Sequence, residues 1–251
     1  MNPHLISGYK YDLRVYVLVT SFNPLKVYMY TDGLVRFATE KYTLDPKNIN
    51  QKFIHLTNFS INKKNTQKFV QNNDKKEQSA ESSKWDFKQL EVSFEKFGLD
   101  YKKTMVEIQE IVLKTLISVE PTINMNMHKY PTFRNNCFEL YGFDVIIDEY
   151  LKPWVLEVNV RPSLSSSSIF DKRIKTMLMC DALTLVGIRG YDKLEFSEAA
   201  SEEKTLAPFQ QSMTLEELKY KQALTGKEVL TPDEMEMLLD LEDEGSRMGN
   251  F

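Results

Sequence analysis

Two carboxylates and one amide stand out because they lie within apolar segments. Asp144 belongs to the segment FELYGFDVIIDEY, and Glu157 and Asn159 belong to the segment PWVLEVNV. Both segments are typical of buried β-strands. Burying a carboxylate among apolar residues costs several kcal/mol unless a positive charge or a metal ion compensates it. These residues therefore require a compensating partner.

The two segments predict the strands of a β-hairpin with a short loop between them. In the simplest register, Asp148 lies opposite Pro153, and Asp144 lies opposite Glu157. Asn159 projects from the same face as Glu157, because side chains alternate along a strand. Facing carboxylates repel each other, and a hard divalent cation removes that repulsion. An all-oxygen ligand set of this kind suits Mg²⁺ that is also bound by the phosphates of a substrate.

The alternative is that Asp144 and Glu157 are exposed residues on the solvent-facing side of an edge hairpin, where they need no metal. No histidine or cysteine accompanies them, which argues against a zinc site. The sequence also lacks a Walker-type loop, a GxGxxG fingerprint and a nucleophile elbow, which argues against P-loop, Rossmann and serine-hydrolase sites.

The composition is that of an ordinary globular protein, with 251 residues, 42% of them hydrophobic and 27% charged. Two cysteines, Cys137 and Cys180, make a disulfide scaffold unexpected and suit a reducing compartment. The first residues become charged too early for a signal peptide, and the longest apolar stretches are too short to span a membrane.

The net charge of −4 conceals an asymmetry along the chain. Residues 1–76 contain 12 Lys or Arg against 5 Asp or Glu, a charge of +7, whereas residues 191–251 contain 6 against 15, a charge of −9. One interpretation is two solvated faces of opposite sign. The other is that the basic part faces an anionic nucleotide, an acidic peptide, or both.

Hydrophobic periodicity predicts the elements that position these residues. The segment YDLRVYVLVTS is a strand with one apolar face, and residues 25–42 are predicted as a hairpin that turns at Asp32–Gly33. Residues 52–64 are predicted as a short strand and loop, and residues 62–83 as a mobile polar insertion. Helices are expected over residues 101–121 and 171–187, and further helices are expected to begin at Thr214 and Thr231.

Several motifs together resemble the tubulin tyrosine ligase-like amino-acid ligases, and most closely their glutamylase branch. The motifs are GYKYDLRVYVLV, YTDGLVRFATEKY, HLTNFSINK, FELYGFDVIIDEYLKPWVLEVN and PSLSSSS followed by D and IK, in that order. The resemblance runs through residues 2–188 apart from the insertion. It implies an α+β fold, namely the C-terminal part of an ATP-grasp fold with a mostly antiparallel sheet and packed helices, followed by a helical extension. The expected domains are residues 1–190 and 191–251.

The resemblance also implies an activity. ATP and Mg²⁺ would serve to activate a glutamate side chain in an acidic tubulin tail as an acyl phosphate, and the amine of free L-glutamate would then form an isopeptide bond. Implied with this are microtubule partners, a cytoplasmic and cytoskeletal location that includes the cilium and basal body, a monomeric state, and no nucleic-acid or membrane partner. The alternatives are a non-catalytic microtubule-binding remnant and a related glycine or tyrosine ligase.

Carried over by position, the resemblance implies a role for individual residues in four groups. The magnesium ligands are Asp144, Glu157 and Asn159, and the nucleotide-side residues are Lys10, Asp12, Thr57 and Asn58. The catalytic residues are Arg14 and Arg36, with Arg14 directed toward the phosphates. The positions that hold the incoming glutamate are Arg36, Ser60, Lys84 and Lys175. Arg36 suits a carboxylate because a guanidinium is a planar fork of donors.

The chain departs from the family pattern in three respects. Segments that precede NPHLISGYK in the family, which include nucleotide-clamping lysines, are absent from it, and the family pattern continues past EDEGSRMGNF, so truncation is expected at both ends. Arg161 stands where a small residue is common, and would contact a phosphate or the tubulin tail or obstruct the site. Phe59 stands where tyrosine is common, at the loss of one hydroxyl.

Overall fold

The computed structural model describes residues 2–65, 83–127, 129, 137–187 and 232–251. These residues form two compact units, Met1–Ala182 with Asn250–Phe251, and Leu183–Gly249. The first unit contains nearly all of the predicted elements. The boundary expected near residue 190 lies outside the described residues, as does the helix expected to begin at Thr214.

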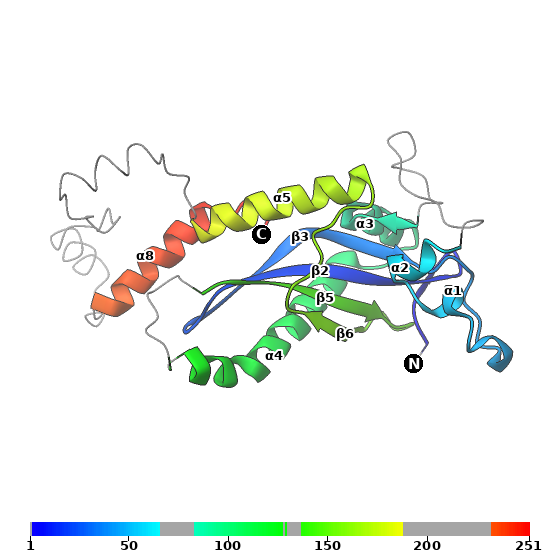
Figure 1. The fold of residues 1–251 in the computed structure, drawn as a ribbon, viewed down its shortest axis with the longest axis horizontal. Coiled ribbons are helices and arrows are strands. Elements are labelled where there is room, and N and C mark those ends of the chain that lie inside the picture. The colour runs from blue at the N-terminus through cyan, green and yellow to red at the C-terminus, as the bar shows by residue number, and fades with distance from the viewer. Residues whose placement is uncertain (1, 66–82, 128, 130–136, 188–231) are drawn as a thin grey trace. The chain divides into compact units, whose positions relative to one another are not determined.

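The first unit is built on an antiparallel sheet (Figure 1). The order across the sheet is β4-β3-β2-β5-β6, and β1 pairs with β2. The strands are β1 (Leu5–Ile6), β2 (Tyr9–Phe22), β3 (Leu25–Phe37), β4 (Lys84–Trp85), β5 (Glu139–Ile147) and β6 (Pro153–Asn159). The helices are η1 (Pro46–Asn48), α1 (Lys52–His55), α2 (Phe59–Asn62), α3 (Phe87–Lys96), α4 (Tyr101–Met127), α5 (Ile169–Val186) and α8 (Pro232–Ser246). The α+β fold with a mostly antiparallel sheet and packed helices is confirmed.

The alternation along β2 decides which face of the sheet becomes the core. Its odd-numbered residues from Leu13 to Val19 are completely buried and pack against α3 and α4. The predicted amphipathic helix is confirmed as α4, whose buried stripe includes Ile108, Val112 and Leu116. The even-numbered residues of β2 therefore point to the opposite face, where the charged side chains lie.

Helix α5 lies against that opposite face, and Figure 1 shows α4 and α5 on opposite sides of the sheet. Phe170 and Ile174 of α5 pack on Leu34 of β3 in a small apolar cluster of their own. The beginning of α5 is thereby fixed over the strands that carry the polar residues. No described helix is long and apolar enough to cross a bilayer.

The predicted hairpin turn at Asp32–Gly33 is wrong. Both residues lie inside β3, and the chain reverses earlier, at Asn23–Pro24 between β2 and β3. Asp32 Oδ1 accepts hydrogen bonds from the backbone N–H of Gly33 at 2.7 Å and from that of Phe87 at 3.1 Å. The Asp–Gly pair therefore attaches the first residue of α3 to the strand.

Gly33 is a glycine because two other groups occupy the place of a side chain. A Cβ atom at this position would lie 2.5 Å from the carbonyl oxygen of Arg14 and 2.5 Å from Cζ of Phe87. A glycine within a strand commonly marks such a close approach. The same residue that resembles a turn signal in the sequence therefore serves close packing of β2, β3 and α3.

Residues 52–64 form the short helices α1 and α2, and the predicted short strand is wrong. Asn62, at the end of α2, is buried and donates from Nδ2 to the carbonyl oxygen of Leu56 at 2.7 Å. Its Oδ1 accepts from the backbone N–H of Thr39 at 3.1 Å. The first residues of the expected insertion are thus anchored, and residues 66–82 lie outside the described residues.

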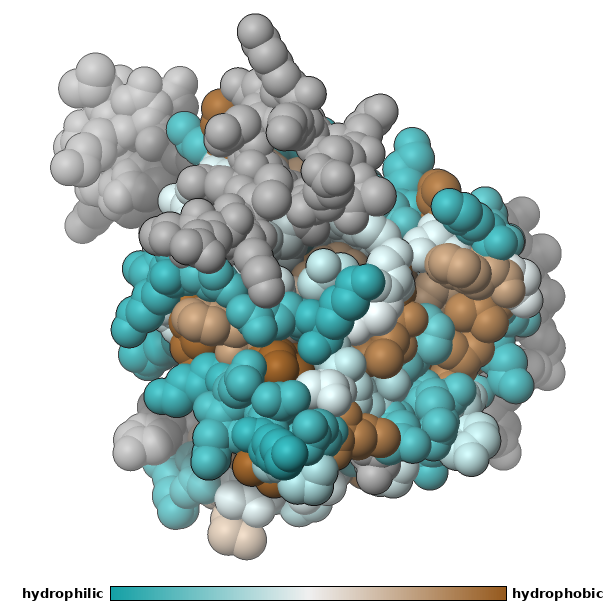
Figure 2. Space-filling view, turned by 90° about the vertical axis from the view of Figure 1, so that its right-hand side faces the viewer, coloured by the Kyte–Doolittle hydropathy of each residue, from teal (hydrophilic) through white to brown (hydrophobic). Residues whose placement is uncertain are grey.

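The end of the molecule that carries α1 and α2 faces the viewer in Figure 2. Hydrophilic side chains predominate among the described residues on this side, and hydrophobic ones form small separate patches between them. Leu44, Ile49 and Leu56, three exposed hydrophobic residues of the η1 to α2 region, are separated by polar neighbours in the sequence. Single exposed apolar residues of this kind need no partner.

We expect Gly33→Ala to lower the free energy of unfolding by about 3 kcal/mol, because the new methyl group overlaps backbone and an aromatic ring that cannot both move aside. Urea unfolding followed by circular dichroism measures the change. Gly245→Ala is the matched control, since nothing lies within 4 Å of the added Cβ; in a helix that change is neutral or stabilises by up to about 1 kcal/mol. Equal unfolding midpoints for Gly33→Ala and the unmodified chain would contradict the packing role.

Candidate functional site

Four charged residues from three adjacent strands form an ion-pair network on the face of the sheet opposite the core. The strand register places Asp12 opposite Arg36 and Arg14 opposite Asp144. Arg14 binds Asp144 with two donors, Nε to Oδ1 at 2.5 Å and Nη2 to Oδ2 at 3.1 Å. Arg36 Nη2 lies 2.8 Å from Asp144 Oδ2, and Arg36 Nε donates to Asp12 Oδ1 at 3.0 Å. Asp144 is therefore shared by two arginines.

Both acids of the network are almost inaccessible to solvent, with Asp12 exposed by 2% and Asp144 by 3%. Burial alone would raise the pKa of Asp144, but hydrogen bonds from Arg14 and the charges of Arg36 and Arg14 outweigh it, so that the pKa lies below its ordinary value. Burial alone would lower the pKa of Arg36, and the charges of Asp12 and Asp144 reverse the effect. Asp144 and Arg36 are thus charged at neutral pH.

The predicted pairing of Asp144 with Glu157 is present in the structure, although part of the predicted register is wrong. Pro153 lies opposite Ile147, and not opposite Asp148. A register irregularity next to Asp144 leaves one residue of β6, Leu156, without a partner, and this restores the Asp144–Glu157 pair.

Asp148 instead closes the hairpin loop. Its Oδ1 accepts from the backbone N–H of Tyr150 at 2.9 Å and from that of Lys152 at 3.0 Å. Its Oδ2 accepts from Trp154 Nε1 at 2.9 Å. A turn held by an aspartate side chain displaces the register by one residue relative to the simplest hairpin, which explains the error in the predicted pairing near the loop.

Burial separates the two facing acids. Asp144 lies on β5, which is buried between two neighbouring strands, whereas Glu157 and most of β6 are exposed. The prediction of two buried strands is wrong for β6, because β6 is the last strand of the sheet and pairs only with β5. The alternative of an exposed edge hairpin therefore describes Glu157, and the buried carboxylate Asp144 is compensated by arginines.

The third predicted metal ligand lies beside the other two. Asn159 Nδ2 donates to Glu157 Oε1 and to the carbonyl oxygen of Gly142, both at 3.2 Å. Gly142 leaves the necessary space, since a Cβ there would lie 2.8 Å from Pro162 Cβ and 3.2 Å from Arg14 Cδ. One arginine and one asparagine can therefore approach the same point of β5 from neighbouring strands.

The donor set of Asp144, Glu157 and Asn159 fits a hard cation in its chemistry, because all three offer oxygen. Glu157 is the most accessible of them, while both oxygens of Asp144 already accept from arginine. A cation would therefore be approached chiefly from the side of β6. Among the described residues, no group of three or more His, Cys, Asp or Glu side chains could hold a metal ion.

Two of the residues expected to hold glutamate lie next to each other on β3 and β4. Lys84 is opposite Arg36 in the strand register. Its Nζ lies 2.6 Å from Asp171 Oδ2 and 3.2 Å from Ser167 Oγ, and 4.4 Å from the centre of the Phe59 ring. The ring of Phe59 thus has a cation–π contact that does not need the hydroxyl of a tyrosine.

Lys175 adds a third cation from α5. Its Nζ donates to the carbonyl oxygen of Ser165 at 2.5 Å. Burial lowers the pKa of Lys175; the charge of Asp171 opposes this, and the positive charges of Lys84, Arg14 and Arg36 lower it further. The charges of these four cations therefore act on one another in the folded protein.

The remaining predicted residues are only partly linked to this cluster. Lys10 precedes Asp12 on the same face of β2, and burial lowers the pKa of Lys10 while the charge of Asp12 raises it. Thr57, Asn58 and Ser60 lie at and within α2, where Ser60 is exposed. Among the described residues, no hydrogen bond joins Ser60 to Lys84 or Arg36.

The sequence interpretation missed two residues that position this region. Asn62 was placed in the insertion, yet its side chain holds the loop before α2 against Thr39. Asp171 has no role in the sequence interpretation, yet it pairs with Lys84. A single buried polar residue produces no periodic pattern in the sequence. The only signal that could have identified Asn62 and Asp171 is that each lies within one of the family motifs.

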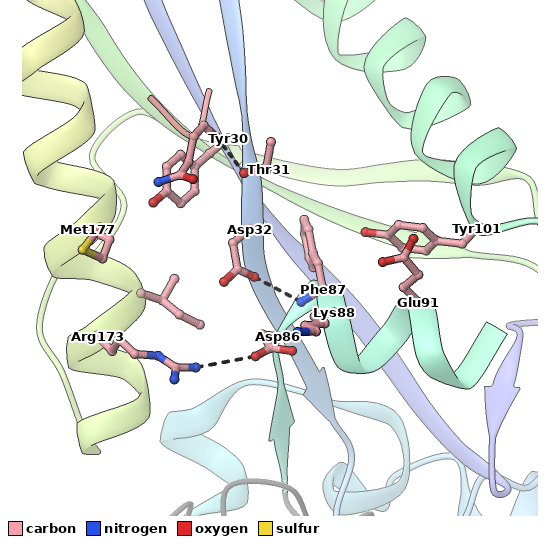
Figure 3. A pocket seen from close by; sticks show the side chains of 12 residues that line it. Tyr30, Thr31, Asp32, Asp86, Phe87, Lys88, Glu91, Tyr101, Arg173 and Met177 are labelled. Carbon is pink, nitrogen blue, oxygen red and sulfur yellow. Dashed lines mark hydrogen bonds and ion pairs between the residues drawn. The ribbon is translucent and has the colours of Figure 1, made fainter. Parts of the chain in front are cut away.

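A separate cavity of about 590 Å³ lies between β3, α3 and α5 (Figure 3). It is lined by Asp32, Asp86 and Glu91, with Arg173 pairing with Asp86 at 3.6 Å. Burial raises the pKa of Asp32, hydrogen bonds from Phe87 and Gly33 oppose this, and the charge of Asp86 raises it further. None of the predicted site residues line this cavity, whose lining contains three acids and two basic residues, Lys88 and Arg173.

We expect Asp144→Asn to lower the free energy of unfolding by about 3 kcal/mol, because it leaves the charges of Arg14 and Arg36 without their shared buried carboxylate. The control is Glu110→Gln on α4, which breaks an exposed ion pair with Lys114; a change of less than about 0.5 kcal/mol is expected there. Urea unfolding of both variants provides the comparison. A loss for Asp144→Asn no larger than that of the control would show that the network does not stabilise the sheet.

Comparisons with known proteins show the family to which the chain belongs. The model of the tubulin-tyrosine ligase family matches residues 1–193, which include every predicted site residue. The chain is 39% identical over 273 residues to the tubulin monoglutamylase TTLL4 of Homo sapiens, which covers 100% of this chain and 22% of that protein. It is 42% identical over 186 residues to the tubulin polyglutamylase TTLL5 of Homo sapiens, covering 74% of this chain and 14% of that protein.

A third relative is the tubulin polyglutamylase ttll-4 of Caenorhabditis elegans, which is 35% identical over 261 residues, covering 100% of this chain and 42% of that protein. The chain therefore spans less than half of the length of each of these curated relatives. The α+β architecture is consistent with the ATP-grasp-like domain of the family. With the family model covering more than three quarters of its residues, this chain belongs to the tubulin-tyrosine ligase family.

Proposed function

We propose that this chain is part of an ATP-dependent ligase that joins glutamate to glutamate side chains in the acidic tails of tubulin. The observation that carries the proposal is the convergence of Arg36, Lys84 and Lys175, from three different elements, beside the carboxylate pair Asp144–Glu157. The named relatives, which are tubulin monoglutamylases and polyglutamylases, supply the substrate class.

The charges of the cluster favour an anionic substrate. Four cations, Arg14, Arg36, Lys84 and Lys175, stand against three buried carboxylates, Asp12, Asp144 and Asp171, while Glu157 is exposed to solvent at the sheet edge. The excess positive charge lies in a partly desolvated place, where electrostatic attraction is stronger than in water. Glutamate carries two carboxylates, so it matches this cluster better than glycine or tyrosine, which carry one each.

Individual residues have distinct parts in the proposed reaction. ATP would supply the phosphoryl group that activates the acceptor carboxylate, and Mg²⁺ held by Asp144, Glu157 and Asn159 would offset phosphate charge. Arg36 and Lys84 bind and orient the carboxylates of the incoming amino acid. Arg14, fixed by two hydrogen bonds to Asp144, presents a positive charge that does not need to reorganise as charge develops during transfer.

The proposed partner is the microtubule. The proposed location is therefore the cytoskeleton, including the cilium. Residues 1–76 carry a charge of +7, which favours approach to acidic tails. Arg161 lies two residues after Asn159, the last residue of β6, and is exposed. We propose that it contacts the tail or a phosphate, because an exposed cation beside an anion site lowers the cost of approach.

The rival is a microtubule-binding module without catalysis. The observation in its favour is that both oxygens of Asp144 are engaged by arginines. The negative charge of this carboxylate is therefore compensated without a metal ion. Isothermal titration calorimetry of the chain with ATP, with and without Mg²⁺, separates the two. Ligase chemistry predicts micromolar ATP binding that weakens by at least about tenfold when Mg²⁺ is removed. Microtubule binding without ATP binding would favour the rival.

The activity test is transfer of labelled glutamate to microtubules by the full-length protein that contains this chain. We expect Glu157→Gln to lower the rate by about 100-fold or more, because loss of one metal-binding carboxylate removes several kcal/mol of charge stabilisation. Glu149→Gln, an exposed acid in the loop of the same hairpin, is the matched control and retains the rate. Full activity of Glu157→Gln would overturn the metal assignment, and preferential incorporation of glycine or tyrosine in competition would overturn the substrate.

A further inference from the structure

Asp171 is a buried acid to which the proposed reaction assigns no role. It lies in the first turn of α5 and is only 1% exposed. Its Oδ2 accepts from Lys84 Nζ at 2.6 Å and from Ser167 Oγ at 2.5 Å. Its Oδ1 has no hydrogen-bond partner among the described residues. All of its described side-chain hydrogen bonds are therefore directed to Lys84 and Ser167.

Asp171 is not needed to cap the helix in which it lies. Ser168 performs that part, since its Oγ accepts from the backbone N–H of Asp171 at 3.1 Å. In a capping box the acid at this position would bond to the backbone N–H of Ser168. Here it reaches one residue further, to Ser167 and Lys84. The carboxylate of Asp171 is therefore oriented toward Lys84 and not toward the backbone of its own helix.

A contribution to stability alone does not account for the pair either. The side chains of Lys84 and Asp171 are exposed by 11% and 2%. Removing two charges from water costs about as much as their attraction returns, so a buried ion pair contributes little to net stability. What such a pair does supply is a fixed position for the charged atoms.

Lys84 needs that fixation more than the arginines do. A lysine ammonium is a point charge on a flexible four-carbon chain, whereas a guanidinium is a rigid fork. Lys84 also lies directly opposite Arg36 in the strand register, and like charges in that relation repel each other. Without Asp171, repulsion from Arg36 and the freedom of its own chain would both move the ammonium away from the cluster.

The charge of Asp171 persists at neutral pH. Burial raises the pKa of Asp171, but hydrogen bonds from Lys84 and Ser167 and the charges of Lys84 and Lys175 outweigh it, so that the pKa lies below its ordinary value. The acid is thus available as a permanent anchor beneath Lys84.

We propose that Asp171 is a positioning residue that holds the ammonium of Lys84 beside Arg36, and that this fixed pair of cations selects an amino acid with a second carboxylate. The inference rests on the proposed function. Asp171 does not touch the substrate; it acts through Lys84. Its removal should therefore weaken binding of glutamate more than it slows the chemical step.

The kinetic test uses the full-length protein with Asp171→Asn, Lys84→Met and the double variant. Asp171→Asn should raise the KM for glutamate by about tenfold, with kcat within about twofold and the KM for ATP unchanged. Because both residues act through one contact, the double variant should lose no more than Lys84→Met alone. Independent, multiplying effects would overturn the proposal, as would an equal rise in both KM values.

Three further variants keep the test decisive. Asp181→Asn, on the same helix and bonded to Tyr30 and Asn250, is the control and leaves the KM for glutamate unchanged. Asp171→Glu should recover part of the affinity, since it restores the carboxylate. Ser167→Ala removes one contact of the anchor without burying an uncompensated charge, and it should raise the KM for glutamate by about threefold. No change in Ser167→Ala together with no recovery in Asp171→Glu would contradict positioning.

A direct readout separates this inference from the proposed function. The rate of acetylation of Lys84 by an amine-reactive ester, followed by mass spectrometry of the 251-residue chain, needs no enzymatic activity. Asp171→Asn should raise that rate by about fivefold or more, with Lys114, an exposed lysine, as the internal reference. Increased acetylation without any glutamate transfer would overturn the function and retain the anchor. Unchanged acetylation would overturn the anchor.

Discussion

The arrangement of the candidate site depends on one carboxylate that is shared by two arginines. Asp144 joins β5 to β2 through Arg14 and reaches β3 through Arg36, so a single buried charge holds three adjacent strands in register on their polar face. Each arginine also restrains the other, because both bind Oδ2 of Asp144. The positions of Arg14 and Arg36 are therefore properties of the sheet, set before any substrate is bound.

Charge is divided between two separate places in the first unit. The polar face of the sheet collects arginines and lysines, each with a carboxylate or carbonyl partner. The cavity between β3, α3 and α5 collects acids and phenols, and burial with neighbouring carboxylates raises the pKa of Tyr101 beside it. Tyr30 and Asp32 of β3 line the cavity, whereas Arg36, further along the same strand, belongs to the ion-pair network. The two groups of charged side chains thus occupy different stretches of one strand.

Much of the fold follows from local patterns, and the errors have a common origin. The alternation in YDLRVYVLVTS fixes the core face of β2, and the spacing of Ile108, Val112 and Leu116 fixes that of α4. Asp32–Gly33 resembles a turn, but a glycine is needed at position 33 because Phe87 of another element occupies the place of a side chain. The exposure of β6 follows from its place at the sheet edge. Contacts between elements distant in the sequence decide these features, and no local pattern contains them.

The site shows the same division. The facing of Asp144 and Glu157 could be predicted because it needs only a hairpin and its alternation. The roles expected for Lys84 and Lys175 rest on resemblance to a family, since each alone is an ordinary surface lysine in the sequence. The roles of Asn62 and Asp171 were not predicted because they depend on hydrogen bonds with Thr39 and Lys84, which lie 23 and 87 residues away in the sequence.

The extra residue in β6 has a consequence for how the hairpin tolerates change. Leu156 has no partner across the strands, and it divides the hairpin into a loop end and a ligand end whose registers are set independently. In a regular hairpin, adding or deleting one residue at the loop would turn Glu157 and Asn159 to the other face. Here an added or removed residue can be absorbed at this irregularity. A change in the length of the loop would then leave Asp144 and Glu157 aligned.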